Sequence, residues 1–362
     1  MMKHPRSWSA LAAGLSALTV LALAGRAASA EGPRAPVSLQ GAGATFPAPL
    51  YAKWVAVYNA SEQGARVDYQ PIGSGGGIKG ITDRTIDFGA SDAPLTEEQL
   101  GAAPGKLLHI PTVSGPVVLA YNLGDVRQLT LDGATLAGIY LGEITNWSDP
   151  KLAALNAGVR LPNLDIIVVH RSDGSGTSWI FTNYLSKVSP VWKTRVGNAT
   201  SVKWPVGIGG KGNPGVAQEV KNTEGAIGYL ELAYAESAKL HFAAQINRAG
   251  KPVRASVPSV VEAAANSAES IPEDLRITIT DAPGDGSYPI CGFTFLLIYE
   301  DLSYFNDANK ARELVRFIYW CCHQGQEMAK DLQYARLPQA LQKKVAEKLA
   351  TVSFKGKPAS AD

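Results

Sequence analysis

Short segments with two different hydrophobic periods alternate along this chain, and this alternation restricts its fold more than any other feature. Apolar side chains recur at helical spacing over residues 47–58 and at every second position over residues 67–71. The same order of strand, turn and helix returns over residues 164–184. All-β barrels repeat only the strand pattern and helical bundles only the helical one, whereas α/β proteins alternate the two. The sequence therefore predicts an α/β fold.

Further elements continue this pattern to the end of the chain. Strands are expected at residues 85–88, 117–121, 277–280 and 293–299, and helices after Ser74, over 309–332 and after Pro338. Thr96 and Gln99 have the spacing of a capping box at a helix start. Four apolar residues within 309–332 lie on one helical stripe and predict a buried face: Leu314, Phe317, Ile318 and Cys321.

The length of the chain favours two domains. About 330 residues remain once a leader is removed, and a single hydrophobic core stops growing at roughly 250–300 residues. We predict one lobe from residues 31–120 together with 290–362 and a second from 121–289, each a mixed sheet flanked by helices. The chain would cross between the lobes twice and so form a hinge. A ligand cleft is expected between the strand ends and the helix starts.

The beginning of the chain, residues 1–30, has the composition of a cleaved export signal. Lys3 and Arg6 precede an apolar stretch over residues 10–24, and Ala28-Ser29-Ala30 is the small-x-small pattern that a signal peptidase cuts. The alternative is a membrane anchor, but about 15 apolar residues fall short of the roughly 20 that span a bilayer. No cysteine occurs before Cys291, so no lipid-attachment site lies near the cut. We predict a mature periplasmic chain that begins at Glu31 and inserts no segment into the membrane.

The charge of the mature chain argues against nucleic acid and acidic membrane surfaces as partners. The leader holds three basic residues and no acidic one, so Lys and Arg fall from 34 to 31 against 32 Asp and Glu. A nearly neutral protein lacks the general positive field that binds nucleic acid or an acidic membrane surface. If the protein binds an anion, the affinity must come from local dipoles with at most one arginine.

The three cysteines, Cys291, Cys321 and Cys322, are too few and too unevenly spaced for a disulfide framework. Cys321 lies on the apolar stripe named above, so we expect it to be buried as a small apolar residue. A bridge from Cys321 to Cys291 stays open as the alternative.

Three separate turns rich in Gly, Ser or Thr stand immediately ahead of expected helices. They are residues 43–47, 73–77 and 174–177, two in the first predicted lobe and one in the second. A helix start presents unpaired backbone N–H groups and the positive end of the helix dipole, so each turn is a potential anion site. For any one of them taken alone, ordinary N-capping is the better explanation. Three such turns together favour an anion site shared by both lobes.

The residue spacings do not match the motifs of nucleotide-binding, hydrolase or metal sites. Neither residues 73–80 nor residues 209–212 place Ser or Thr after their lysine, as a nucleotide P-loop requires. Ser74 and Ser175 lack the first glycine of a Gly-x-Ser-x-Gly hydrolase turn. No metal-ligand spacing connects His109, His170, His241 and His323, for which structural or surface roles are expected. The sequence thus predicts neither a metal site nor a catalytic one.

Five segments together resemble the periplasmic phosphate-binding protein family of the phosphate ABC transporter. They are GAGATFPAP at 41–49, IGSGGG at 72–77, DFGASDAP at 87–94, RSDGSGTS at 171–178 and KWPVGIGGKG at 203–212. The likeness runs in order through nearly the whole mature chain. It implies the type II periplasmic-binding fold, one phosphate between two lobes, permease subunits of the transporter as partners, a monomer and no cofactor or catalysis.

Carried over to these segments, the resemblance implies a specific ligand set. Phosphate would be held by Thr45, Phe46, Ser74, Asp92, Arg171, Ser175, Gly176 and Thr177. Arg171 offers a planar fork for two oxygens, and Asp173 could pair with it and hold its orientation. Asp92 could accept the proton that phosphate still carries near neutral pH. A secreted phosphatase on the same scaffold, or a binder of another tetrahedral oxyanion such as sulfate or molybdate, are the alternatives.

Overall fold

The structure, a computed structural model, describes residues 36–61, 64–267 and 271–359, so the expected leader lies outside the described residues. Its main sheet contains β1 (Val37–Gly43), β2 (Ala65–Gln70), β3 (Phe88–Ser91), β4 (Leu107–Tyr121), β6 (Ile167–Arg171), β7 (Ile208–Gly210), β8 (Ala226–Glu231), β9 (His241–Phe242) and β12 (Cys291–Tyr299). The strand order is β2-β1-β3-β12-β4-β8-β6-β7, and β9 pairs with β4. Two small sheets join β5 (Thr130–Leu131), β10 (Ala244–Ile246) and β11 (Pro252–Val253), and β13 (Ser353–Phe354) with β14 (Lys357–Pro358).

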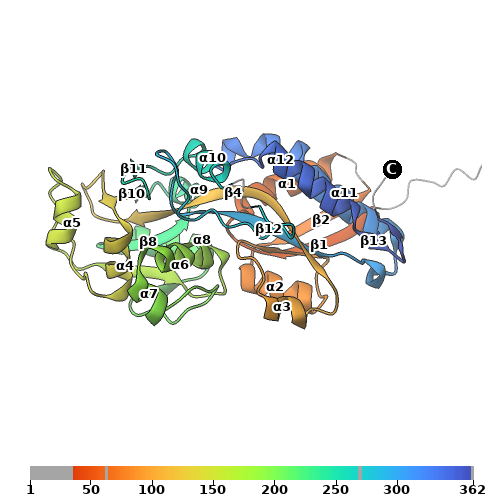
Figure 1. Cartoon of the computed structure of the whole chain (residues 1–362), viewed down its shortest axis with the longest axis horizontal. Helices are drawn as coiled ribbons and strands as arrows, with labels where there is room; N and C mark the ends of the chain where they lie inside the picture. Colours follow the sequence, from red (N-terminus) through yellow and green to blue (C-terminus); the bar gives the residue numbers. More distant parts are fainter. Residues whose placement is uncertain (1–35, 62–63, 268–270, 360–362) are drawn as a thin grey trace, which may run out of the picture. The chain divides into compact units, whose positions relative to one another are not determined.

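Helices lie on both faces of the main sheet, as Figure 1 shows for α1 and α11 on one face and α2 on the other. The helices are α1 (Ala48–Ala60), α2 (Ser74–Thr82), α3 (Glu97–Ala102), α4 (Gly133–Leu141), α5 (Pro150–Leu155), α6 (Gly176–Val188), α7 (Pro190–Arg195), α8 (Gly212–Asn222), α9 (Leu232–Ser237), α10 (Val257–Ala265), α11 (Ala308–Cys322) and α12 (Gln339–Ala350). The predicted α/β class is confirmed.

Strand β4 joins the two halves of the sheet. All of its residues are buried, and it pairs antiparallel with β12 over 107–116 and with β8 over 117–121. The two halves are therefore linked through this strand, and each half holds both parallel and antiparallel pairs, the mixed sheet that the sequence predicted for each lobe. The lobe boundaries at 120/121 and 289/290 stay a prediction.

The strands that precede the binding turns run parallel within each half. In the first half β1 pairs parallel with β2 and β3, and in the second half β6 pairs parallel with β7 and β8. Carboxyl ends of parallel strands meet at one edge of a sheet, and ligands bind in the crevice beyond that edge. This topology gathers the turns that follow β1, β2 and β3, and separately those that follow β6, β7 and β8.

Glycine lets helix α2 approach the sheet closely at this edge. A Cβ atom at Gly77 would lie 2.6 Å from the carbonyl oxygen of Ala90 and 2.7 Å from the Cα of Gly43, both backbone atoms that cannot move aside easily. The first turn of α2 therefore lies directly against the ends of β1 and β3.

Several local predictions are confirmed and three are corrected. Thr96 and Gln99 form the capping box at α3, the stripe of α11 is buried, and the last helix follows Pro338. Strand β3 covers Phe88–Ser91 rather than residues 85–88, because its pairing with β1 starts at Phe88. Residues 277–280 form no strand; Ile277 and Ile279 are buried, but Ile277 bonds to the carbonyl of Leu275 instead of a neighbouring strand. The helix expected over 309–332 is α11, which ends at Cys322, and two short 3₁₀ turns, Gln324–Met328 and Lys330–Leu332, follow it.

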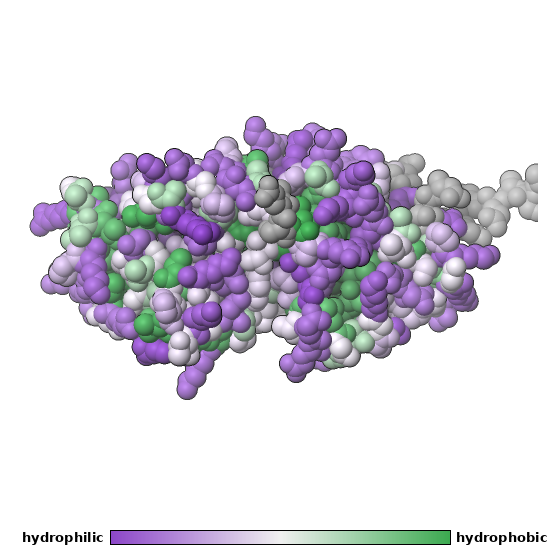
Figure 2. All heavy atoms as spheres, in the orientation of Figure 1, coloured by the Kyte–Doolittle hydropathy of each residue, from purple (hydrophilic) through white to green (hydrophobic). Residues whose placement is uncertain are grey.

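The three cysteines form no disulfide bond with one another. Cys291, Cys321 and Cys322 are all free and buried, so the alternative of a Cys291–Cys321 bridge is not realised and the buried apolar role is confirmed for Cys321. On the face in Figure 2, hydrophilic side chains surround small, separated hydrophobic areas. The exposed large apolar residues of the described chain are scattered along the sequence, as is normal for a protein surface: Ile72, Val191, Val206, Ile208, Val261 and Tyr319.

Candidate functional site

The predicted ligand residues come together at the strand ends. Thr45 follows β1, Ser74 opens α2 after β2, Asp92 follows β3, Arg171 ends β6, and residues 175–177 open α6. Each of these side chains is at most 5% exposed. Hydrogen bonds connect the start of α2 with the turn that opens α6. Gly176 N–H donates to Ser74 Oγ at 3.0 Å, and Gly75 N–H donates to the Gly174 carbonyl at 2.9 Å.

The Ser74 hydroxyl is held as a hydrogen-bond donor. Its oxygen accepts the N–H of Gly176 and, at 3.3 Å, the N–H of Asp92. A hydroxyl has two acceptor positions and one proton, so two incoming N–H groups leave only the proton to offer. Ser74 can therefore donate to the Asp92 carboxyl or to an anion beside it.

Asn213, which the sequence analysis missed, holds two further hydroxyls in the same way. Its Nδ2 donates to Thr45 Oγ1 at 3.0 Å and to Thr177 Oγ1 at 3.1 Å. Thr45 Oγ1 also accepts the Asn213 backbone N–H, and Thr177 Oγ1 also accepts Nη1 of Arg171 at 3.3 Å. Both threonines are thus left with a proton to donate.

The amide of Asn213 cannot be assigned the other way round. Its Oδ1 lies 2.9 Å from the N–H of Glu231, and a backbone N–H can only donate. This bond fixes which end of the amide faces the threonines. A signal for Asn213 did exist in the sequence: it is the second residue of α8 (Gly212–Asn222), a helix that begins just after the glycine-rich strand β7.

Arg171 and Asp173 form the pair expected from their spacing. Nε and Nη2 of Arg171 donate to the two carboxylate oxygens of Asp173 at 2.8 and 2.6 Å, and the guanidinium side chain is 1% exposed. Burial acts to raise the pKa of Asp173, but hydrogen bonds and charge from Arg171 and the N–H of Gly212 bring it below its ordinary value. Asp173 therefore stays ionised and fixes the plane of the guanidinium fork.

Asp92 is the unusual acid of the site. Burial raises its pKa from an ordinary 3.8 to about 7, although hydrogen bonds from Thr294 and Ser74 and the charge of Arg171 act in the opposite direction. The hydroxyl of Thr294, on β12, donates to Asp92 Oδ1. A carboxyl group with this pKa can hold or accept a proton near neutral pH.

Backbone N–H groups complete the donor set. Those of Thr45, Phe46, Ser74 and Thr177 donate to no other residue within the described ranges. Ser175 caps α6 by accepting the N–H of Ser178, which also leaves its hydroxyl proton available. The site thus combines N–H and O–H donors, one guanidinium and one proton-accepting carboxyl, which is the complement of a protonated oxyanion.

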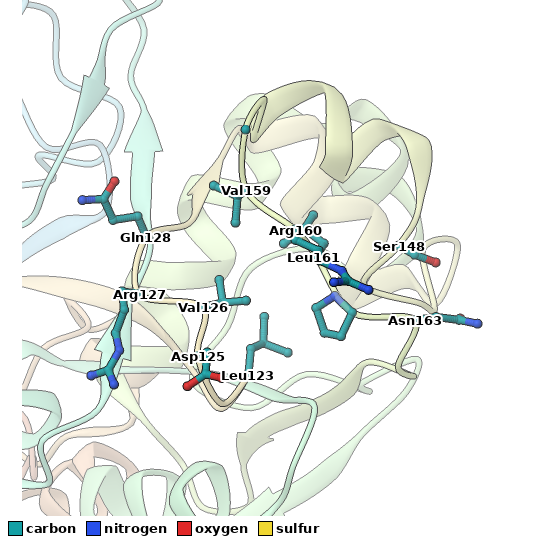
Figure 3. A pocket seen from close by; sticks show the side chains of 12 residues that line it. Leu123, Asp125, Val126, Arg127, Gln128, Ser148, Val159, Arg160, Leu161 and Asn163 are labelled. Carbon is teal, nitrogen blue, oxygen red and sulfur yellow. The ribbon is translucent and has the colours of Figure 1, made fainter.

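A surface hollow elsewhere does not share these properties. It encloses about 910 Å³ between loops of residues 123–128 and 158–163, with Ser148 at its side (Figure 3). Arg127 and Arg160 bring charge to it, but none of the predicted ligand residues lines it. In the described part of the chain, no group of three or more His, Cys, Asp and Glu side chains is placed to hold a metal ion.

Comparison with known proteins gives consistent matches over most of the chain. The family model of the PBP superfamily domain matches residues 28–321. The phosphate-binding protein PstS of Xylella fastidiosa (strain Temecula1) is 45% identical over 85% of this chain and 84% of its own. That of Pasteurella multocida is 44% identical over 85% and 88%. A solved periplasmic phosphate-binding protein, PfluDING with bound phosphate, superposes with a TM-score of 0.68 at 20% identity, covering 89% of this chain and 96% of that one.

Proposed function

This chain belongs to the PBP superfamily and, within it, to the phosphate-binding proteins PstS, and from this membership we propose that it captures inorganic phosphate and delivers it to a phosphate ABC transporter. The predicted type II fold agrees with its solved neighbours. The permease subunits of that transporter are the partners that receive the phosphate, and the binding protein acts as a monomer without a cofactor.

One observation carries the proposal: two parallel strand groups direct a fixed set of donors, with one carboxyl acceptor, at the same place. We propose as ligands Thr45, Phe46, Ser74, Asp92, Arg171, Ser175, Gly176 and Thr177, with Asp173 and Asn213 orienting them. Rigid donors of this kind stabilise an anion without mobile charge, and Arg171 is the cation among them. Isothermal titration in phosphate-free buffer should find one site that binds phosphate and arsenate, and an absence of heat with both would refute the proposal.

The alternative of a phosphatase on this scaffold is less well supported. A phosphate ester would need room for its alcohol group, whereas Thr45, Ser74 and Thr177 are each at most 5% exposed. Each of these hydroxyls already accepts N–H donors rather than facing a free base. A chromogenic phosphate ester should release no product above the buffer rate, and turnover that disappears with Ser74→Ala would favour the enzyme instead.

Selectivity against sulfate is expected to depend on Asp92. Phosphate near neutral pH carries a proton that the Asp92 carboxylate can accept, but sulfate carries none, so its oxygens face the carboxylate unpaired. Leaving a buried charged group unpaired costs about 1–3 kcal/mol or more. We predict that Asp92→Asn changes phosphate affinity modestly and narrows the ratio of phosphate to sulfate affinity by roughly tenfold or more, about 1.4 kcal/mol.

Titration of both anions at fixed ionic strength measures this ratio. About pH 8, one unit above the pKa of Asp92, keeps the wild-type carboxyl mostly ionised. Thr294→Val is the matched control, because it removes the hydroxyl bonded to Asp92 but keeps the carboxylate. A ratio that is the same in wild type and Asp92→Asn would place selectivity elsewhere.

We propose further that phosphate draws the two predicted lobes together about their two crossings. The ligand set is divided between residues 31–120 and 121–289, so a ligand that touches both parts favours the state in which they are close. X-ray scattering should therefore report a smaller radius of gyration with phosphate than without it. An unchanged radius at saturating phosphate would argue against closure but not against binding.

Export is the remaining part of the proposal. Within the described residues, no helix is long and apolar enough to cross a membrane. We propose that a signal peptidase cuts after Ala30 and releases the mature chain into the periplasm. Mass spectrometry of the periplasmic fraction should find Glu31 at the N-terminus, and finding Met1 on the mature protein would contradict this.

A further inference from the structure

Three tyrosine hydroxyls bond to three consecutive carbonyl groups of the first binding turn. Tyr69 donates to the carbonyl of Ala44 at 2.7 Å, Tyr234 to that of Thr45 at 2.6 Å, and Tyr334 to that of Phe46 at 2.7 Å. The tyrosines come from β2, from α9 and from the segment that follows the last 3₁₀ turn. Three distant parts of the chain thus converge on one short stretch of backbone.

Holding these carbonyls also orients the N–H groups on their far side. A peptide unit is planar and trans, so its C=O and the N–H of the next residue point in opposite directions. The carbonyl of Ala44 shares its peptide unit with the N–H of Thr45, and the carbonyl of Thr45 shares its unit with the N–H of Phe46. These are two of the N–H groups that donate to no other described residue.

We propose that Tyr69 and Tyr234 are positioning residues for phosphate binding, which aim the N–H groups of Thr45 and Phe46 at the anion by holding the opposite ends of their peptide units. The inference rests on the proposed function and deepens it. Without the two hydroxyls, each peptide unit would be freer to rotate, and its N–H would have to be ordered when phosphate binds.

Both side chains are suited to this role. Burial raises the pKa of Tyr69 and of Tyr234 above the ordinary 10.0, so each keeps the proton that it donates. The ring of Tyr69 packs edge-on against that of Tyr51, with 5.1 Å between the ring centroids, and stacks on that of Phe88, with 6.4 Å between the centroids. Tyr69→Phe therefore removes the hydrogen bond and leaves the ring packing in place.

The chain supplies its own matched control. Tyr334 makes the same kind of bond to the next peptide unit, but that unit belongs to Pro47, which has no N–H. Tyr334→Phe thus removes an equivalent carbonyl bond, together with the contact of Tyr334 with Glu231 at 3.1 Å, without releasing a donor to phosphate.

The experiment measures phosphate affinity by isothermal titration and the free energy of unfolding by urea for wild type and the three variants. Tyr69→Phe and Tyr234→Phe should each weaken phosphate binding by about three- to tenfold, the range for one neutral hydrogen bond. Tyr334→Phe should lower stability while changing affinity less than about twofold. Equal affinity losses in all three variants would show a general structural role and overturn the proposal.

Amide NMR of the complex adds a readout that stability alone would not move. On saturation with phosphate, the Thr45 and Phe46 amide protons should shift downfield in the wild type. Tyr69→Phe should reduce the shift of Thr45, and Tyr234→Phe that of Phe46, whereas Tyr334→Phe should reduce neither. The proposal would be refuted if the Thr45 shift in Tyr69→Phe and the Phe46 shift in Tyr234→Phe both equalled those of the wild type. If one of these variants does not fold, the other still tests the proposal. If wild type itself bound no phosphate, the proposed function would fail instead.

Discussion

In phosphate-free buffer, the free energy of unfolding of the wild type should fall relative to that of Asp92→Asn by on the order of 4 kcal/mol as the pH rises from about 4 to about 7. Asp92 is 2% exposed, and its pKa rises from the ordinary 3.8 to about 7 on folding. Each unit of difference in pKa between the folded and unfolded chain corresponds to about 1.4 kcal/mol.

The sign follows from proton binding. Below about pH 4 both the folded and the unfolded chain hold the Asp92 proton, and the stability of its buried neutral form is fully present. Between about pH 4 and 7 the unfolded chain has lost this proton while the folded chain keeps it, so raising the pH favours unfolding. Above about pH 7 both have lost it and the difference levels off. Asparagine has nearly the same shape and does not titrate.

A comparison of two variants is needed because His109 acts in the opposite direction. Burial, and then the charge of Arg276, lowers the pKa of His109 from 6.5 to about 4, so folding is favoured as the pH rises through that window. In urea titrations, the free energy of unfolding of the wild type should therefore rise relative to that of His109→Gln as the pH rises. Parallel curves for wild type and Asp92→Asn would mean that Asp92 does not titrate between about pH 4 and 7.

The sequence was informative where neighbouring residues determine the structure. Period and turn chemistry predicted helices directly after the turns at 73–77 and 174–177, and α2 and α6 begin within those turns, at Ser74 and Gly176. The two-residue spacing of Arg171 and Asp173 predicted their ion pair. These features depend on a few adjacent residues, so they can be read without knowing how distant elements pack.

Features that depend on distant contacts were not visible. Residues 277–280 alternate like a strand, but alternation shows only which side chains are buried and not whether a partner strand is present. Tyr69, Tyr234 and Tyr334 look like ordinary aromatic core residues until the fold brings their hydroxyls to one turn. Asn213 lies one residue beyond the segment 203–212 that carries the resemblance, and only the fold brings its amide to Thr45 and Thr177.

Arg171→Ala is expected to weaken phosphate binding by about 1.5–3 kcal/mol, or roughly 10- to 150-fold, the range for hydrogen bonds to a charged group. Its Nε and one Nη2 proton are taken by Asp173 and one Nη1 proton by Thr177, which leaves two Nη protons to donate to the anion. The substitution removes these charged donors and leaves the Asp173 carboxylate without its partner. Binding should persist through the N–H and hydroxyl donors, because they come from other elements.

Arg171→Lys and Lys211→Ala separate geometry from charge. Lysine keeps the positive charge but not the planar fork, so Arg171→Lys should recover only part of the lost affinity. Lys211 is exposed and adjacent to the start of α8, so Lys211→Ala should change affinity less than about threefold, as expected for a solvent-screened charge. Titration of each variant at two salt concentrations completes the test. Full affinity in Arg171→Ala, with its fold verified by urea unfolding, would place Arg171 outside the phosphate site and leave the helix-start donors to hold the anion by themselves.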